Sequence, residues 1–129
     1  MPRSYTLTRT GRLLITRAAV RGPAGTKVIN LLVDTGSTFT ILPVEVLESI
    51  GLSPAKSKEH ERIATGSGYI IAPKLRVRSF NTLGGEFRRV ALIAHTLPFG
   101  GPIDGLLGMD ILCRLKAKIA AASGIVEVG

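Results

Sequence analysis

The sequence has no tryptophan, one cysteine, four phenylalanines and two tyrosines in 129 residues. A single cysteine excludes an intrachain disulfide and gives no reason to expect an oxidising compartment. No apolar run approaches the roughly 20 residues of a membrane span, and the N-terminal segment lacks the apolar stretch of a signal peptide. We therefore expect a cytoplasmic protein without a membrane partner, whose core is built from leucine, isoleucine, valine and alanine.

The sequence is also poor in the side chains that most often bind metals or act as bases. It has two histidines, His60 and His95, and no cluster of histidine, cysteine and acidic residues has the spacing of metal ligands. Ser67 lacks the glycine two positions earlier that a nucleophile on a sharp strand-to-helix turn requires. Cys113 follows an Ile-Leu pair, which is typical of a small buried apolar residue. We therefore expect no metal and no other cofactor, and we assign the histidines to surface or strand positions.

Positive charge is in excess, with 17 Lys and Arg against 9 Asp and Glu and a net charge of +8. Nucleic acid is the first partner that such a balance suggests. However, Lys74, Arg76 and Arg78 alternate with apolar residues, Arg88 and Arg89 form an isolated pair, and no stacking aromatic repeat accompanies them. We interpret the basic residues as solvated strand faces and expect no nucleic-acid partner. A basic surface that prefers acidic partners remains open as an alternative.

Apolar and polar residues alternate over most of the chain, which predicts strands. Turn-forming clusters separate three pairs of such strands, and the expected hairpins join residues 13–20 with 26–33, 75–80 with 87–93, and 116–122 with 125–128. Pro43 suits the first position of a short helix that Gly51 ends, and Met109–Arg114 fits one or two helical turns. We predict a single all-β domain over residues 1–129, a closed or nearly closed antiparallel barrel with one or two short helices.

One aspartate of three has an unusual position. Asp34 ends an apolar strand and precedes Thr35, Gly36 and Ser37, so it is either an ordinary turn residue or a reactive acid on a rigid loop. Hydrolysis by carboxylates needs two of them, because like charges about 3 Å apart cannot both ionise and the pair can then act as base and acid. One chain offers one such aspartate, and a two-fold dimer would supply the second.

Three segments together resemble a known family. Val33-Asp34-Thr35-Gly36-Ser37 matches the active-site motif of aspartic proteases, and Leu106-Leu107-Gly108 matches their second signature before a short helix. Between them, residues 63–71 with the tip Gly66-Ser67-Gly68 stand where these enzymes carry a flap hairpin. From about Thr6 to Val128, the chain is similar to single-domain, retroviral-type (retropepsin-like) aspartic proteases.

The resemblance implies a role for each matched residue. Asp34 would be catalytic, one from each subunit of a homodimer, and Thr35 would join the two active-site loops across the dimer axis. Gly36 would let the substrate backbone approach, with Ser37 supporting the loop. The flap would cover a protein or peptide substrate with Gly66, Ser67, Gly68 and Tyr69. The second signature would pack under the aspartate loop and support it with Leu106, Leu107 and Gly108.

Some details differ from the commonest retroviral pattern or stay open. Ser37 replaces the usual alanine, and a hydroxyl that donates to a carboxylate would shift activity towards acid. Tyr69 either lies over the bound peptide or faces solvent on its strand. We expect Asp104 to be a turn residue and Asp110 to cap or solvate the short helix. The strand that joins the subunits is either residues 125–128 or the N-terminal segment 1–10.

Two other functions are compatible with parts of this pattern. Asp-x-Gly-Ser-Thr after an apolar strand also occurs in the phosphate loop of actin-like ATPases and sugar kinases, but those folds need a second lobe for which this chain has no room. The same fold also serves as a non-catalytic dimeric protein-interaction module. An intact Asp-Thr-Gly-Ser favours an aspartic endopeptidase, because a buried pair of acids is a poor device for stability.

Overall fold

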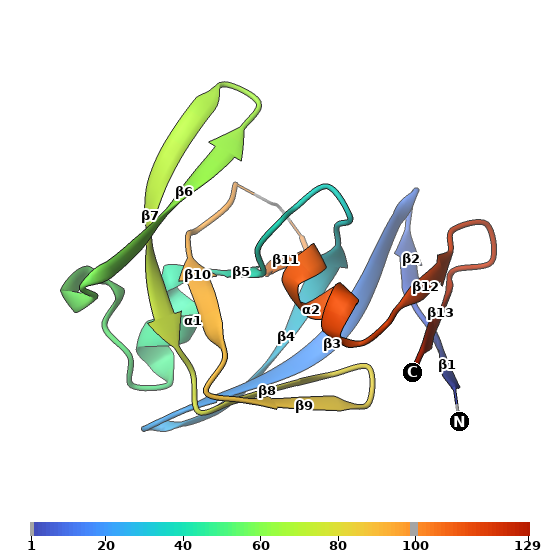
Figure 1. Cartoon of the computed structure of the whole chain (residues 1–129), viewed down its shortest axis with the longest axis horizontal. Helices are drawn as coiled ribbons and strands as arrows, with labels where there is room; N and C mark the ends of the chain where they lie inside the picture. The colour runs from blue at the N-terminus through green and yellow to red at the C-terminus, as the bar shows by residue number, and fades with distance from the viewer. Residues whose placement is uncertain (1, 99–100) are drawn as a thin grey trace.

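A computed structural model describes residues 2–98 and 101–129. Strands make up most of this part of the chain, together with three short helical segments (Figure 1). The helical segments are α1 (Val44–Ser49), the 3₁₀ turn η1 (Pro54–Lys56) and α2 (Met109–Arg114). The strands are β1 (Arg3–Thr6), β2 (Thr8–Thr10), β3 (Leu13–Gly22), β4 (Gly25–Val33), β5 (Ile41–Leu42), β6 (Glu59–Thr65), β7 (Gly68–Arg76), β8 (Ser79–Thr82), β9 (Gly85–Arg88), β10 (Ala91–Ala94), β11 (Gly105–Leu107), β12 (Lys118–Ala120) and β13 (Ile125–Val128).

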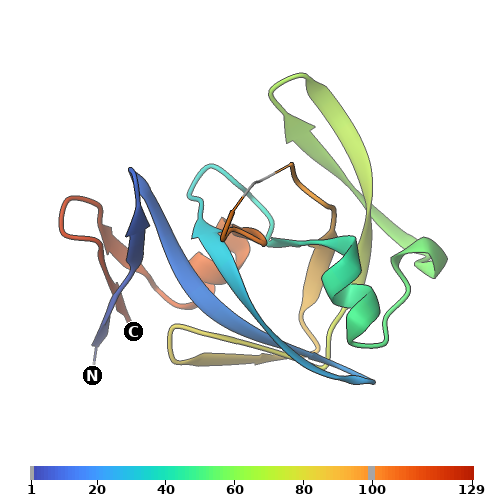
Figure 2. The ribbon, with the colours of Figure 1, turned by 180° about the vertical axis from the view of Figure 1, so that it is seen from behind.

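The strands form one large curled sheet and one small sheet. The large sheet has the order β6-β7-β10-β5-β11-β4-β3-β8-β9, with β2 paired to β3, and the small one has the order β1-β13-β12. The large sheet bends into a half-barrel, and the β6–β7 hairpin projects from it on one side (Figures 1 and 2). The all-β prediction is thus confirmed with a few short helices, whereas a closed barrel is not confirmed, since β6 and β9 stand at opposite ends of the strand order.

All three predicted hairpins have the expected partners. β3 pairs with β4 from Ile15–Leu32 to Gly22–Gly25, and β12 pairs with β13. The third hairpin, residues 75–80 with 87–93, has Leu75 opposite Leu92 and Phe80 opposite Phe87, but its strands are interrupted in the middle. β8 and β9 form a shorter hairpin, while the flanking residues belong to β7 and β10, which pair with each other. Alternation alone did not reveal the breaks between β7 and β8 and between β9 and β10.

Helix α1 ends as its sequence predicts. Gly51 has a φ of +92°, its N–H donates to the carbonyl of Glu48, and the N–H of Leu52 donates to the carbonyl of Leu47 at 3.0 Å. These two bonds satisfy carbonyls that the helix end would leave free, as in a Schellman motif. Pro43 is the residue that precedes the helix, with extended backbone angles, and not its first helical residue.

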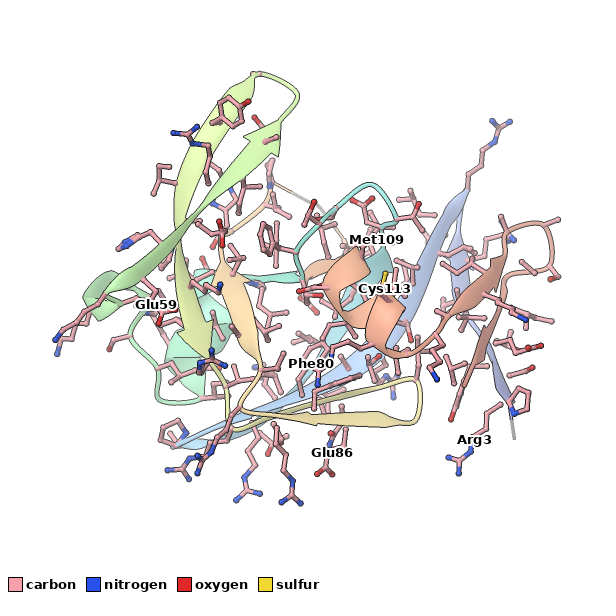
Figure 3. All side chains as sticks on the ribbon, viewed as in Figure 1. Arg3, Glu59, Phe80, Glu86, Met109 and Cys113 are labelled. Atoms are coloured by element: carbon pink, nitrogen blue, oxygen red, sulfur yellow. The ribbon has the colours of Figure 1, made fainter. Side chains whose placement is uncertain are left out.

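The core is aliphatic, as the composition predicts, with Phe80 as its largest fully buried side chain (Figure 3). A second, smaller cluster lies where the β6–β7 hairpin joins the sheet. Its buried members are Ile41, Ala72, Ile93 and Leu106, with Leu32, Phe39, Ile63 and Leu97 packed against them. None of the helices in the described part of the chain has the length and apolar character that crossing a bilayer requires.

Candidate active site

The site is built where β11 inserts between two strands that are consecutive in the chain. β4 ends at Val33, the chain loops out through Asp34, and it returns as β5. β11 pairs in parallel with β4, placing Leu107 opposite Val33, and pairs antiparallel with β5 through Leu106 and Ile41. Leu106, Leu107 and Gly108 are all buried, so this apolar strand forms the floor of the Asp34 loop, as predicted.

Backbone hydrogen bonds fix Asp34 at the start of this loop. Its N–H donates to the carbonyl of Leu107 at 3.0 Å, and its own carbonyl accepts the N–H of Ser37 at 3.2 Å. The Asp34 carboxylate is partly buried, and its Oδ1 accepts the N–H of Gly36 at 2.9 Å. The aspartate therefore forms an ordinary side-chain turn, and that turn also holds the carboxylate in one orientation.

Close packing restricts two glycines in this region, and it restricts Gly108 far more than Gly36. A Cβ on Gly36 would lie 3.2 Å from Oδ1 of Asp34, and a Cβ on Gly108 would overlap the backbone carbonyl of Phe39. Because a backbone carbonyl has little freedom to move, we infer that Gly108 must remain glycine for the two loops to approach each other. This explains why the Leu-Leu-Gly signature ends in that residue.

The hydroxyl of Ser37 does not act as the sequence predicted. Its Oγ donates to the carbonyl of Phe39 at 2.7 Å, and a hydroxyl has only one hydrogen to donate. Ser37 therefore supports the loop backbone, and the expected acid shift through a bond to Asp34 loses its basis.

Helix α2 anchors the other end of the loop. The first N–H groups of a helix have no partner within it. In α2, the N–H of Met109 donates to the carbonyl of Ser37 at 2.8 Å, and the N–H of Asp110 donates to the carbonyl of Thr38 at 3.1 Å. The Asp34 loop thus caps α2 with its own carbonyls, and α2 in turn fixes the position of the loop.

Sequence reasoning missed a pair of residues that connects these segments. Thr40 is fully buried; its N–H donates to Oδ2 of Asp110 at 3.0 Å and its hydroxyl donates to Oδ1 at 2.7 Å. The Thr40 hydroxyl also accepts the N–H of Gly108 at 3.1 Å. The prediction that Asp110 caps or solvates α2 is therefore incomplete, because its carboxylate mainly links the helix to the strand after the Asp34 loop. A threonine–aspartate pair 70 residues apart gives no signal in a single sequence.

Asp104 also differs from its prediction as a turn residue. Its Oδ2 accepts the N–H of Asn30 at 2.8 Å, and its own N–H donates to the carbonyl of Asn30 at 2.8 Å. The residue therefore extends the contact between β4 and the start of β11.

The β6–β7 hairpin has the predicted flap position and a turn at Gly66-Ser67. Cross-strand partners share one face of a hairpin, so Ile63 and Ile70 lie on the face that packs towards the second cluster. Tyr69 lies on the opposite face, 70% exposed, with the Arg62 guanidinium 5.2 Å from its ring centre. This placement favours the alternative in which Tyr69 faces solvent, and it puts Ile70 on the same face of the hairpin as Ile63.

Thr35 is exposed on the other side of the loop, next to α2. It borders a mainly apolar pocket of about 290 Å³ that is also lined by Met109, Leu112, Cys113, Lys116, Ala117 and Ile119. Met109 and Cys113 lie one helical turn apart on the outer face of α2 (Figure 3). The prediction that Cys113 is buried is wrong, since α2 turns this side chain outwards. Among residues 2–98 and 101–129, no three His, Cys, Asp or Glu side chains gather as metal ligands would.

A family model described as aspartyl protease matches residues 17–111, well over half of the chain. The chain belongs to the aspartyl protease family. The matched region contains the Asp34 loop, the flap and the Leu-Leu-Gly segment, which are the three features of this family that the sequence predicted.

Two relatives of this aspartyl protease family member extend the comparison. DNA damage-inducible protein 1 of Yarrowia lipolytica is 31% identical over 104 residues, which are 78% of this chain and 25% of that protein. The chain thus spans about a quarter of the length of this relative. A crystal structure of a retropepsin-like aspartic protease from Rickettsia conorii superposes with a TM-score of 0.73 at 22% identity, over 99% of this chain and 91% of that one. The fold is therefore retropepsin-like.

Proposed function

We propose that this chain is an aspartic endopeptidase that hydrolyses peptide bonds in an extended polypeptide as a homodimer. Each subunit would contribute one Asp34, and residues 1–129 would form one domain with half of a two-fold site. The two carboxylates would share a proton, so that one activates a water while the other protonates the substrate. The observation that carries this proposal is the position of Asp34, whose backbone N–H is bound by the Leu107 carbonyl and whose carboxylate accepts the N–H of Gly36.

The surface beside Thr35 supports a second subunit at this position. Thr35 is exposed, and the adjacent pocket is lined mainly by apolar side chains, with Met109 37% exposed. An apolar surface next to an active-site loop suits contact with another chain. Thr35 would then meet its counterpart close to the dimer axis, where it would join the two loops.

The flap defines the side from which substrate would enter. Gly66, Ser67 and Gly68 form an exposed tip whose turn is held by the Thr65 hydroxyl, which donates to the carbonyl of Gly68 at 3.1 Å. This tip would open for entry and close over the bound polypeptide. The apolar face with Ile63 and Ile70 would line the cleft and favour apolar residues beside the cleaved bond.

The proposal is tested with a fluorescein-labelled unstructured protein as substrate at about pH 4–6, the range in which a shared proton persists on such carboxylate pairs. Wild type should cleave it, and Asp34→Asn should abolish cleavage without loss of fold. Glu48→Gln, which removes one exposed acid of α1, should cleave as wild type does. If wild type and Asp34→Asn are equally inert while sedimenting as dimers, the chain is a non-catalytic interaction module and the proposal fails.

A further inference from the structure

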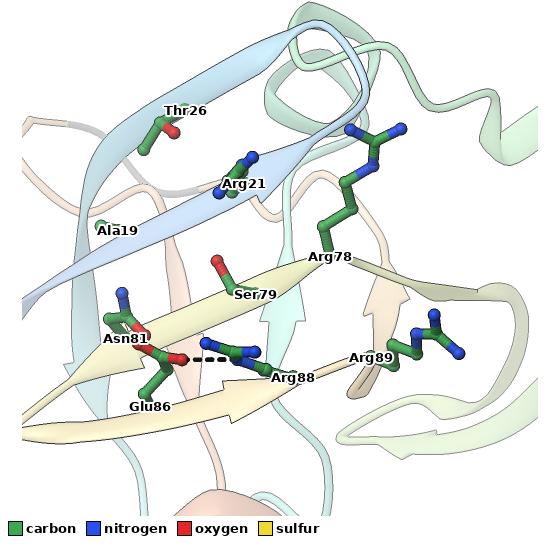
Figure 4. A pocket seen from close by; sticks show the side chains of 9 residues that line it. All are labelled: Ala19, Arg21, Thr26, Arg78, Ser79, Asn81, Glu86, Arg88 and Arg89. Carbon is green, nitrogen blue, oxygen red and sulfur yellow. Dashed lines mark hydrogen bonds and ion pairs between the residues drawn. The ribbon is translucent and has the colours of Figure 1, made fainter.

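One concave surface that the structure describes lies away from the Asp34 loop. It lies across β3, β4, β8 and β9, on the side of the molecule opposite the flap (Figures 1 and 4). This surface, the arginine pocket, has a volume of about 780 Å³ and is lined by Ala19, Arg21, Thr26, Arg78, Ser79, Asn81, Glu86, Arg88 and Arg89. Four of these nine residues are arginines, and Glu86 is the one acid among them.

The sheet register explains how residues far apart in the sequence meet here. Thr26 lies opposite Arg21, Arg21 lies opposite Ser79, and Ser79 lies opposite Arg88. Residues that are directly opposite in neighbouring strands share a face, so this row crosses four strands on one face. The small residues Ala19 and Ser79 leave the space between the longer arginine side chains open.

A strained backbone adds a further arginine to this surface. Regular alternation after the buried Phe87 would turn Arg88 outwards and the next side chain inwards. Instead, Arg89 has a φ of +52°, a left-handed conformation that is strained for a residue other than glycine. Both arginines are consequently exposed. The bend is fixed by the N–H of Arg89, which donates to the carbonyl of Arg78, and by the Arg76 guanidinium, which donates to the carbonyl of Arg89 at 2.8 Å.

We propose that the arginine pocket binds an acidic polypeptide segment, one rich in Asp and Glu, of a partner or substrate protein. Arginine side chains bind carboxylates through their charge and through bidentate hydrogen bonds. An extended acidic segment places every second side chain on the same side about 6.6 Å apart, and alternate strands of a sheet lie about 9.6 Å apart. The long, flexible arginine side chains of Arg21 and Arg88, which stand on alternate strands, can span this difference. No aromatic side chain lines the pocket, so it lacks the stacking surfaces on which single-stranded nucleic acids depend.

Glu86 occupies part of this surface in the free chain. Its carboxylate is 2.7 Å from Nε of Arg88, and this contact raises the pKa of Arg88 above its ordinary value. Both side chains are exposed, and exposed ion pairs are weak. An acidic ligand would therefore compete with Glu86 for Arg88, and removing the Glu86 charge would strengthen binding.

The test measures binding and is independent of proteolysis. The protein carries Asp34→Asn, and the probe is a short fluorescein-labelled peptide of alternating glutamate and serine. Binding of this peptide is measured by fluorescence anisotropy. Replacing Arg21, Arg78 and Arg88 together by serine should weaken binding by roughly tenfold or more. The matched control replaces Arg12, Lys56 and Lys58 by serine, removes the same charge elsewhere, and should change the Kd by less than about twofold.

A second variant gives the opposite change and does not depend on the triple variant keeping its fold. Glu86→Gln should tighten binding a few-fold, whereas Glu48→Gln, with the same charge change on α1, should not. Equal losses in the two triple variants, or no tightening with Glu86→Gln, would overturn the proposal. It would also be overturned if a single-stranded DNA of equal charge bound the same arginines more tightly than the glutamate peptide.

Discussion

The Asp110 carboxylate joins α2 to the end of the Asp34 loop through its contacts with Thr40. Thr40 is fully buried and Asp110 is partly buried, so each single substitution leaves a shielded polar group without its partner and should cost about 1–3 kcal/mol of unfolding free energy. Thr40→Val and Asp110→Ala should show a coupling energy of about 1 kcal/mol or more in a double-mutant cycle measured by urea unfolding.

An exposed pair of the same chemistry provides the control for this cycle. The Thr96 hydroxyl donates to Glu45 at 3.0 Å on the surface near α1. Thr96→Val and Glu45→Ala should therefore couple only weakly, because water replaces either partner. Equal coupling energies in the two cycles would contradict a special structural role for Asp110.

The left-handed backbone at Arg89 gives a second prediction at this scale. Arg89→Gly removes the strain, whereas the greater flexibility of glycine in the unfolded chain offsets part of this gain. The net effect should be a stabilisation of the fold by about 0.5–1 kcal/mol. The same change should weaken binding of the glutamate peptide. Lys116, with a φ of +53°, is the matched site: Lys116→Gly should stabilise the fold similarly and leave the binding unchanged. Loss of stability in Arg89→Gly would show that its conformation is not strained.

Individual residues were predictable where the chemistry is local. The sequence placed Asp34 correctly, because an acid after a buried strand and before Thr-Gly-Ser is a contiguous pattern. It misplaced Cys113, because the Ile-Leu pair before it does not say which face of α2 turns outwards. The Thr40–Asp110 pair and the arginine pocket both depend on long-range strand register, which no contiguous pattern encodes.

At the scale of elements, the flap hairpin presents two chemically different faces. Ile63 and Ile70 face the second cluster, whereas Tyr69 stacks with Arg62 on the outside. Ile70→Ser should therefore lower kcat/KM for an apolar peptide by roughly tenfold or more, since burying an isoleucine contributes about 1.5–3 kcal/mol. Tyr69→Ser should change it by less than about threefold. The reverse order would place Tyr69 over the substrate and contradict this register.

Secondary-structure elements were predicted best where turn-forming residues mark their ends. Gly22 to Gly25 and Ser123-Gly124 mark two uninterrupted hairpins, and Gly51 marks the end of α1. The pairing of residues 75–80 with 87–93 was also correct, but its interruption was missed, because the strand breaks fall at Arg78 and Arg89 and not at glycine or proline. Closure of the sheet was also overestimated, because strand count alone does not determine whether the first and last strands meet.

At the scale of the whole molecule, a shared active site makes a quantitative prediction about mixing. If subunits exchange freely, an equal amount of Asp34→Asn chain should leave about one quarter of the dimers with two native aspartates, and total activity should fall to about half. The same amount of an unrelated inert protein should leave activity unchanged. Activity that stays constant on adding Asp34→Asn would show that each chain works alone.

The small sheet restricts how such a dimer is held together. β13 is the central strand, paired with β1 on one edge and β12 on the other, so its backbone has no edge left for a second chain. The alternative in which residues 125–128 extend a sheet between subunits would require β1 or β12 to move away. In the small sheet, the outer edges of β1 and β12 remain open to a partner strand.

Pairing of Arg3 with Val128 also brings the first and last strands together on one side of the fold, away from the flap (Figure 1). Polypeptide attached to either end would leave the molecule from the same place. A tag or surface tether fixed there would hold the protein with its hairpin tip pointing outwards. A short peptide bridge across the two ends would circularise the backbone without disturbing the Asp34 loop.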